Sequence, residues 1–166
     1  MSHSNLIVNY GKIQVKQGNF IDVYRSIHKP SIQYSFIKNT YYCLLMVDMD
    51  SPNKTNPIYK YWLHWMIINI HCQKNLISNY NLITNYDLIN EYIYGQTIMQ
   101  YTEPTPEKDT GPHRFIFLLY KQPQKLNLNN NLPSRKKFNL KIFVNKYNLE
   151  LLSVISFKSE YPKYEK

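Results

Sequence analysis

The chain has 166 residues, 43% of them hydrophobic, and a formal net charge of +9. This length supports one ordinary hydrophobic core, so we expect a single domain over residues 1–166. Its apolar runs are shorter than the roughly 20 residues of a membrane-spanning helix, which argues against a transmembrane protein. The first residues lack a signal-peptide pattern, and Cys43 and Cys72 lack the spacing of a disulfide framework or a zinc site. We therefore expect a cytoplasmic protein with two reduced thiols.

Positive charge is concentrated in the C-terminal part of the chain, where residues 121–166 contain ten Lys or Arg and three acids. A basic surface of this kind could meet nucleic acid or an anionic membrane. Its densest run, "SRKKF" (134–138), is short and precedes a predicted helix, which favours a solvated basic surface. We therefore disfavour a nucleic-acid partner and leave open a weak contact with a membrane surface.

Alternating hydrophobic residues predict strands in the first third of the chain, at Ile13 and Val15 and again at Ile32, Tyr34 and Phe36. Three near-continuous apolar runs predict further strands that are covered on both faces. These runs are "YYCLLMVDM" (41–49), "WLHWMIINI" (62–70) and "RFIFLLYK" (114–121).

One segment near the C-terminus reads as a helix. In "NLKIFVNKYN" (139–148) the apolar residues recur at i, i+3, i+4 and i+7, and Asn139 is a candidate N-cap. The run "LLSVISFK" (151–158) predicts a last strand. The order of elements is therefore mainly β with a late helix.

Residues 75–92 contain three similar hexapeptides, "NLISNY", "NLITNY" and "DLINEY". A six-residue step would scatter the repeated side chains around a helix, whereas on a strand it keeps each position on one face. A β-solenoid needs several stacked coils, which 18 residues do not provide. We interpret residues 71–94 as an inserted hairpin or ordered loop.

Four residues stand out as carriers of chemistry: Asp48 and Asp50 at the end of a predicted strand, His64 within the next, and His113 at the start of another. Each histidine alone is readily explained as part of a core. Together with the acids they could hold a divalent metal, act as an acid and base pair for hydrolysis, or line a pocket for a small anion. No HExxH, GxSxG or P-loop pattern is present to favour the first two.

Two blocks carry a resemblance to a known family. "DMDSPNKTNPIYKYWLHWMIINI" (48–70) and "YTEPTPEKDTGPHRFIFLLYKQ" (101–122) resemble the two conserved blocks of the phosphatidylethanolamine-binding protein family, which includes the Raf kinase inhibitor proteins and plant flowering regulators. "KFNLKIFVNKYNLELLSV" (137–154) and "LIVNYG" (6–11) are similar to its late helix and strand and to its opening strand.

The resemblance implies a mainly β fold, with a large central antiparallel sheet, a second small sheet and peripheral helices. It also implies a pocket for phosphate and phosphate-bearing head groups such as phosphoethanolamine. The residues implied to bind the anion are Asp48, Trp62, His64, Tyr101, Pro106 and His113. Those implied to shape the pocket are Asp50, Ser51, Pro52, Gly111 and Arg114, and the turn at Pro52 can carry a cis peptide bond.

The sequence also departs from the family pattern. Residues 103–107 read Glu-Pro-Thr-Pro-Glu, closer to the plant form, and two acids at the rim of an anion site lower the expected affinity. Phe115 stands where a tyrosine is frequent, and the end of the chain is shorter than the closing helix of the family. These differences bear on ligand specificity and on any binding to a kinase.

The favoured function is a non-enzymatic binding or signalling-regulatory protein without a cofactor, whose protein partner, a kinase or another signalling protein, the sequence does not identify. One alternative is a metal-dependent hydrolase that uses Asp48, Asp50, His64 and His113. Another is a structural protein with a vestigial pocket, associated with a virion if the chain comes from a large DNA virus.

Overall fold

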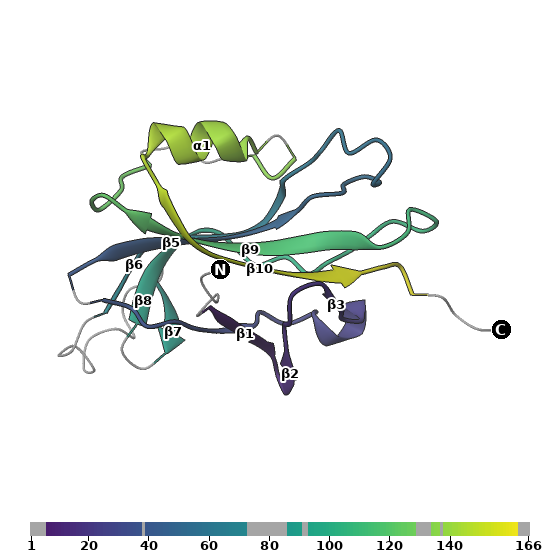
Figure 1. Ribbon diagram of the computed structural model, residues 1–166, viewed down its shortest axis with the longest axis horizontal. Coiled ribbons are helices and arrows are strands. Elements are labelled where there is room, and N and C mark those ends of the chain that lie inside the picture. Colours follow the sequence, from purple (N-terminus) through teal and green to yellow (C-terminus); the bar gives the residue numbers. More distant parts are fainter. Residues whose placement is uncertain are drawn as a thin grey trace.

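The computed structural model describes residues 6–37, 39–72, 86–90, 93–128, 134–136 and 138–162. Its main feature is a seven-stranded sheet, with a three-stranded sheet on one side and a helix on the other (Figure 1). The large sheet contains, in spatial order, β3 (Asn19–Phe20), β10 (Glu150–Ser159), β9 (His113–Gln122), β5 (Tyr41–Asp48), β6 (Trp62–Cys72), β8 (Ile93–Met99) and β7 (Tyr86–Asn90).

The small sheet has the order β2 (Ile13–Gln14), β1 (Ile7–Tyr10) and β4 (Ser31–Gln33). The helical elements in the described ranges are the short 3-10 helix η1 (Val23–Arg25) and the α-helix α1 (Leu140–Lys146). The predicted mainly β fold with a large and a small sheet is thus confirmed.

One strand pair differs from the expected antiparallel arrangement. β3 runs parallel to β10, with Phe157 opposite Asn19 and Lys158 opposite Phe20, so the large sheet is mixed. The chain arrives there from the small sheet and follows β10 in the same direction, and Gly18 donates its backbone N–H to the carbonyl of Ser156 at 2.8 Å. All other strand pairs in the described residues are antiparallel.

The central strand β5 is buried on both faces, as its near-continuous apolar run predicts. Because side chains alternate along a strand, Tyr42, Leu44 and Met46 face the core beneath the small sheet, which includes Val8 and Ile32. Cys43, Leu45 and Val47 face the opposite core, which α1 covers with Phe143. Burial raises the pKa of the Cys43 thiol, which is free as predicted.

The predicted late helix and last strand are present. Asn139 is the N-cap of α1, and its side-chain oxygen accepts the backbone N–H of Ile142 at 3.0 Å. The strands predicted at the start of the chain are shorter than the alternation indicates. β4 ends at Gln33, and the rings of Tyr34 and Phe36 pack on Tyr42 with centroid distances of 6.0 and 5.0 Å.

The hexapeptide region lies partly outside the described residues. Of its three copies only the last residue of the second and the first four of the third are described, as strand β7, which pairs antiparallel with β8 at the edge of the large sheet. The preference for strand over helix is therefore confirmed for residues 86–90, and residues 73–85 lie outside the description. No helix in the described ranges is long and apolar enough to cross a membrane.

Candidate functional site

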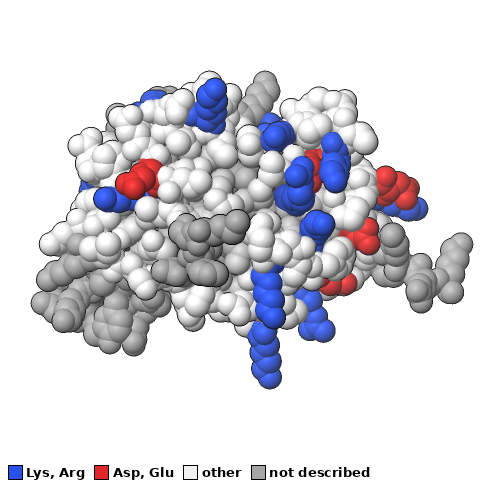
Figure 2. Space-filling model, viewed as in Figure 1, with Lys and Arg blue, Asp and Glu red and all other residues white. Residues whose placement is uncertain are grey.

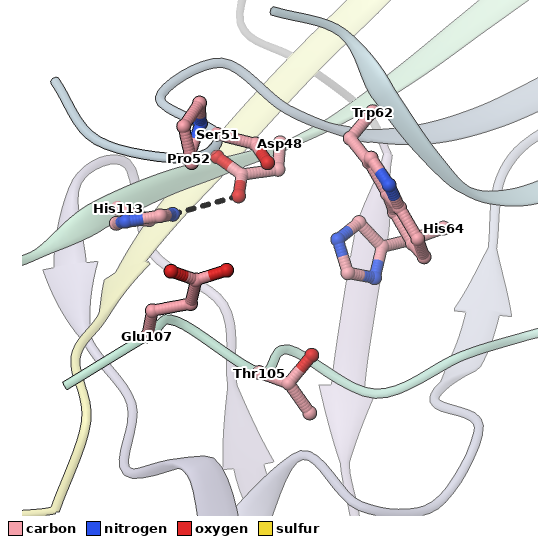
Figure 3. A pocket seen from close by; sticks show the side chains of 8 residues that line it. All are labelled: Asp48, Ser51, Pro52, Trp62, His64, Thr105, Glu107 and His113. Atoms are coloured by element: carbon pink, nitrogen blue, oxygen red, sulfur yellow. Dashed lines mark hydrogen bonds and ion pairs between the residues drawn. The ribbon is translucent and has the colours of Figure 1, made fainter. Parts of the chain in front are cut away.

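The ends of three adjacent strands meet at one end of the large sheet. Asp48 closes β5, Trp62 opens β6 opposite it, and His113 opens β9. Beside them lies a cavity of about 160 Å³, and its wall is completed by the loop that follows β8 (Figure 3). Its lining consists of Asp48, Ser51, Pro52, Trp62, His64, Thr105, Glu107 and His113. The antiparallel order β6, β5, β9 thus gathers side chains from both conserved blocks.

Asp48 is buried, with 5% of the residue exposed, and both of its carboxylate oxygens are engaged. Oδ1 accepts the backbone N–H of Asp50 at 2.7 Å, and Oδ2 lies 2.7 Å from Nδ1 of His113. A carboxylate accepts hydrogen bonds, so Nδ1 of His113 carries the proton of this contact. The strand can therefore end on a buried acid because the charge is hydrogen-bonded on both sides.

His113 is held from its other side as well. Its Nε2 lies 3.0 Å from Oγ1 of Thr110, and Thr110 donates its hydroxyl to the carbonyl of Glu107 at 2.7 Å. The ring also stacks on Phe115, with centroids 6.3 Å apart and planes inclined by 20°. These contacts fix the ring at the cavity wall, where Figure 3 shows it beside Asp48.

His64 faces the cavity from the opposite wall, and 3% of this residue is exposed. Its Nδ1 lies 2.8 Å from the carbonyl of Thr102, which can only accept, so Nδ1 carries the proton. Burial lowers the pKa of His64 to about 4, and the Thr102 hydrogen bond and the charge of Asp48 oppose this effect only partly. Near neutral pH the imidazole is therefore uncharged. Its Nε2 is a free acceptor among the described residues and faces the cavity.

Asp50 shapes the site without lining it. This residue is 1% exposed, and its carboxylate accepts from the backbone N–H of Arg114 at 2.9 Å and from Nε and Nη2 of Arg114 at 2.8 and 2.7 Å. Burial raises the pKa of Asp50, but the hydrogen bonds and charge of Arg114 outweigh it and leave this pKa lowered. This bidentate pair ties the start of β9 to the turn after β5. The Ser51–Pro52 peptide bond in that turn is cis.

Two of the six residues expected to bind the anion lie outside the cavity lining. The hydroxyl of Tyr101 donates to the carbonyl of Ser26 and contacts Tyr10, and burial raises the pKa of Tyr101. Pro106 is buried on the other side of its loop, where it lines a separate apolar groove. Gly111 has a φ of +75° and lies in the loop that leads to His113, outside the lining.

Two further residues line the cavity: Glu107 was expected only as an acid at its rim, and Thr105 was not singled out from the sequence. Thr105 and Glu107 face the cavity, whereas Pro104 and Pro106, which alternate with them along the chain, are buried. Side chains alternate in this way along an extended chain. The expected lining residue, Pro106, is therefore one position away from the two residues that line the cavity. The alternation of proline with polar residues in "EPTPE" indicates that the loop has two different faces, but it does not identify which face meets the cavity.

Arg135 supports the wall from behind and was also not predicted. Its Nη1 donates to the carbonyls of Leu63 and His64 at 2.8 and 3.0 Å, and Nη2 donates to the carbonyl of Gln100 at 2.7 Å. Its guanidinium carbon lies 5.6 Å from the centroid of the Trp62 ring. Burial lowers the pKa of Arg135. This member of the "SRKKF" run is therefore part of the structure of the site, rather than only a solvated charge.

The cavity places two carboxylates near an uncharged imidazole. Asp48 is already paired with His113, while Glu107 is exposed to solvent and points into the cavity (Figure 3). A dianion would be repelled here, whereas a ligand that brings its own proton can donate it to Nε2 of His64. In the described part of the chain no group of three or more His, Cys, Asp or Glu side chains is placed to hold a metal ion.

Comparison with known proteins gives a consistent picture. The family model described as phosphatidylethanolamine-binding protein matches residues 10–157. "Protein TERMINAL FLOWER 1" of Arabidopsis thaliana is 29% identical over 145 residues, covering 87% of this chain and 72% of the plant protein. A "26 kDa secreted antigen" of Toxocara canis is 32% identical over 143 residues, covering 82% of this chain. The chain spans 48% of the length of that antigen and 60% of a Drosophila melanogaster relative.

Solved structures share the fold. A phosphatidylethanolamine-binding protein from Plasmodium vivax superposes with a TM-score of 0.68 at 20% identity, over 95% of this chain and 85% of that one. A carboxypeptidase Y inhibitor, solved in complex with its cognate proteinase, superposes with a TM-score of 0.70 at 22% identity, over 95% of this chain and 83% of that one. At these identities the likeness concerns the fold.

Proposed function

Because the chain belongs to the phosphatidylethanolamine-binding protein family, we propose that it is a non-enzymatic binding protein whose cavity beside Asp48 holds a phosphate-bearing head group such as phosphoethanolamine. One observation carries the proposal. His64 and His113 are both buried, come from different strands and face one small cavity, where Nε2 of His64 has no partner among the described residues. A ring nitrogen that opens onto a cavity has no hydrogen bond until a ligand or water supplies one.

The ligand is held in its singly protonated form. The second pKa of a phosphate monoester is about 6, so near neutral pH the proton is available at small cost. In this proposal the P–OH group donates to Nε2 of His64, and the remaining anionic oxygens lie away from Asp48 and Glu107. Binding then weakens as the pH rises, because the dianion lacks the proton that the site requires.

The size of the cavity supports a head group rather than a larger molecule. Its volume of about 160 Å³ is below the roughly 300 Å³ at which pockets for drug-sized ligands begin. Trp62 covers one wall, 4.6 Å from the ring of His64 between centroids, and excludes water from that side. Tyr101 and Pro106 act in this proposal from behind the loop, by fixing the backbone that carries Thr105 and Glu107.

A regulatory role through a protein partner, a kinase or another signalling protein, belongs to the same proposal, as does a cytoplasmic location. The name of one matched relative describes a secreted protein, so the location needs a direct test. Fractionation of cells that express the tagged chain would provide it. The solved inhibitor complex supports only the general idea that this fold can present a surface to another protein.

The test is a tryptophan-fluorescence titration with phosphoethanolamine, because Trp62 lines the cavity and its emission should respond to an occupied site. We expect a saturable change for the wild type and none for His64→Ala. The matched control is His71→Ala, since His71 lies near the far end of the same strand, opposite Tyr94. A flat wild-type response would contradict the proposal and favour a structural protein with a vestigial pocket.

A chelator arm of the same titration addresses the hydrolase alternative. That alternative needs Asp50 as a ligand, but the Asp50 carboxylate is engaged by Arg114 and does not line the cavity. We expect the chelator to leave the signal unchanged. A signal that the chelator removes and a divalent metal restores would favour the hydrolase.

A further inference from the structure

One rim of the cavity is basic and carries an exposed apolar side chain. We call this surface the basic rim and define it by Lys54, Ile58, Tyr59, Lys60, Arg135 and Lys136. It consists of the β5–β6 loop and the segment 134–136. This segment contacts the start of β6, where Leu63 donates its backbone N–H to the carbonyl of Arg135 at 3.0 Å. In Figure 1 the β5–β6 loop lies on the same side of the large sheet as α1.

Ile58 is an exposed apolar residue of the basic rim, with 64% of its surface exposed. It lies in a turn that is held by hydrogen bonds on both sides. Tyr59 donates its backbone N–H to the carbonyl of Ser51 at 3.0 Å, and Lys60 donates to the carbonyl of Pro57 at 2.9 Å. The turn therefore presents Ile58 to solvent in a fixed position next to the cavity wall at Ser51.

Two lysines of the basic rim lie over tyrosine rings. Nζ of Lys136 is 4.5 Å from the centroid of the Tyr59 ring, and Nζ of Lys60 is 5.1 Å from that of Tyr61. These contacts keep the charges close to Ile58. An apolar tip surrounded by lysines and tyrosines is the composition that proteins use at the boundary between lipid head groups and water.

The charge of the basic rim is uncompensated. Residues 51–62 contain no acid, and Lys54, Lys60, Arg135 and Lys136 form no ion pair with an acid in the described parts of the chain. The β8–β9 loop on the opposite side of the cavity has an acidic balance, with Glu103, Glu107 and Asp109 against Lys108. Figure 2 shows both signs of charge grouped at the end of the molecule where these loops lie in Figure 1.

We propose that the basic rim docks on an anionic lipid bilayer, with Ile58 inserted among the head groups and the lysines against the lipid phosphates. Charge complementarity and the exposed apolar side chain both favour this partner. The β8–β9 loop sets the orientation, because its acidic balance repels it from the same surface. The mouth of the cavity then lies at the edge of the contact.

A bilayer fits this surface better than nucleic acid does. Single-stranded nucleic acid binds by stacking bases on free aromatic faces, whereas the faces of Tyr59 and Tyr61 have lysines placed over them. A partner that presents only phosphates would leave the exposed side chain of Ile58 without an apolar contact. A membrane uses both features, since its surface is anionic and its head-group region accepts apolar side chains.

The test is co-sedimentation with vesicles of phosphatidylcholine that contain about one third phosphatidylserine. We expect binding to these vesicles, none to phosphatidylcholine alone, and loss of binding in 1 M salt, where the Debye length falls to about 3 Å. Since each lysine near such a surface contributes about fivefold, the pair Lys60→Glu and Lys136→Glu should lower the affinity by at least about 25-fold. Ile58→Ser should lower it by about tenfold.

The matched control is the pair Lys12→Glu and Lys16→Glu, which makes the same change in net charge on the side of the small sheet, away from the basic rim (Figure 1). We expect this pair to retain most of the vesicle binding. Equal losses for both pairs would overturn the proposal, because net charge alone would then explain the binding. No binding to the anionic vesicles would overturn it too, as would stronger binding to an RNA oligonucleotide that the basic-rim variants abolish.

This inference stands apart from the head-group proposal, and the experiments separate the two. The basic-rim variants should leave the phosphoethanolamine titration unchanged, because none of the substituted residues lines the cavity. Conversely, His64→Ala should lose the fluorescence response and still sediment with anionic vesicles. A His64→Ala variant that fails to sediment although it is folded would overturn the inference, since vesicle binding would then depend on the cavity.

Discussion

The ion pair between Asp50 and Arg114 can be tested quantitatively by Arg114→Ala. In the wild type 1% of Asp50 is exposed, and the substitution leaves its carboxylate with one donor, the backbone N–H of residue 114 at 2.9 Å. Breaking a buried pair typically costs about 3–5 kcal/mol. The Arg114 side chain is 42% exposed, so solvent screens the pair and we expect about 2–3 kcal/mol of lost unfolding free energy. For a chain of this length that is a fall in Tm of about 4–12 °C.

The pH dependence of this loss provides a second check. In the wild type the pKa of Asp50 is lowered, so its stabilising contribution is present above the unfolded-state pKa of about 4 and is lost as pH falls through the folded-state pKa. Without the Arg114 side chain, the burial of Asp50 becomes the main influence on its pKa, so this pKa rises in the folded state. The difference between variant and wild type should therefore shrink as the pH is lowered from 7 toward 3.

The assay is urea unfolding, followed by far-UV circular dichroism at several pH values. Asp50→Asn and the double variant complete a cycle, in which we expect Arg114→Ala to cost less once residue 50 is neutral. Arg114→Lys is the conservative control, which keeps the charge and loses the bidentate geometry. A cost below about 0.5 kcal/mol, or a cost that does not change with pH, would refute the assignment of Asp50 as a buried ion.

Three further expectations concern the cavity. The affinity for phosphoethanolamine should fall by about fiftyfold between pH 6 and pH 8, because the monoanion becomes rare above a second pKa of about 6; an affinity that stays constant by fluorescence titration would contradict the proton account. Glu107→Gln should raise the affinity for inorganic phosphate several-fold at low salt, since a carboxylate that points into the cavity is removed, and equal affinities would remove this residue from the site. Unfolding free energy should decrease as pH falls from about 6.5 toward about 4, because His64 binds a proton in the unfolded chain before it does in the folded one; His64→Gln should show a flatter profile in the same window, and a parallel profile would argue against a buried neutral imidazole.

The sequence predicted well those elements that depend on neighbouring residues, such as continuous apolar runs and a helix with its N-cap. The continuous apolar runs of β5, β6 and β9 were predicted as strands because a doubly covered strand needs no alternation. The spacing around Phe143 and the capping Asn139 predicted α1, since both the apolar stripe and the cap are local features. The two blocks around His64 and His113 identified the family. The family resemblance then implied that both histidines line one pocket, which their spacing alone left open.

What the tertiary structure decided was the direction of individual side chains and their long-range partners. Asp48 and Asp50 are two residues apart, a spacing that places both side chains on one face of a strand, yet Asp48 faces the cavity and Asp50 turns to Arg114 because the chain bends after β5. In the loop after β8, the hydrogen bond from Thr102 to the carbonyl of His64 at 3.0 Å sets which residues face the cavity. A shift by one position in an extended chain reverses the side, so sequence pattern alone could not choose between Pro106 and its neighbours.

The sequence by itself determined the class of fold, the central strands and the late helix. It also determined the family, because the blocks that contain His64 and His113 both resemble it. It did not determine that Arg135 would support the wall of the cavity, or that Ile58 would stand exposed among lysines beside it. Both depend on contacts between residues more than 70 positions apart. Local propensity carries no information about such contacts, because they form only when the strands have assembled and their free energy depends on the burial that the assembly creates.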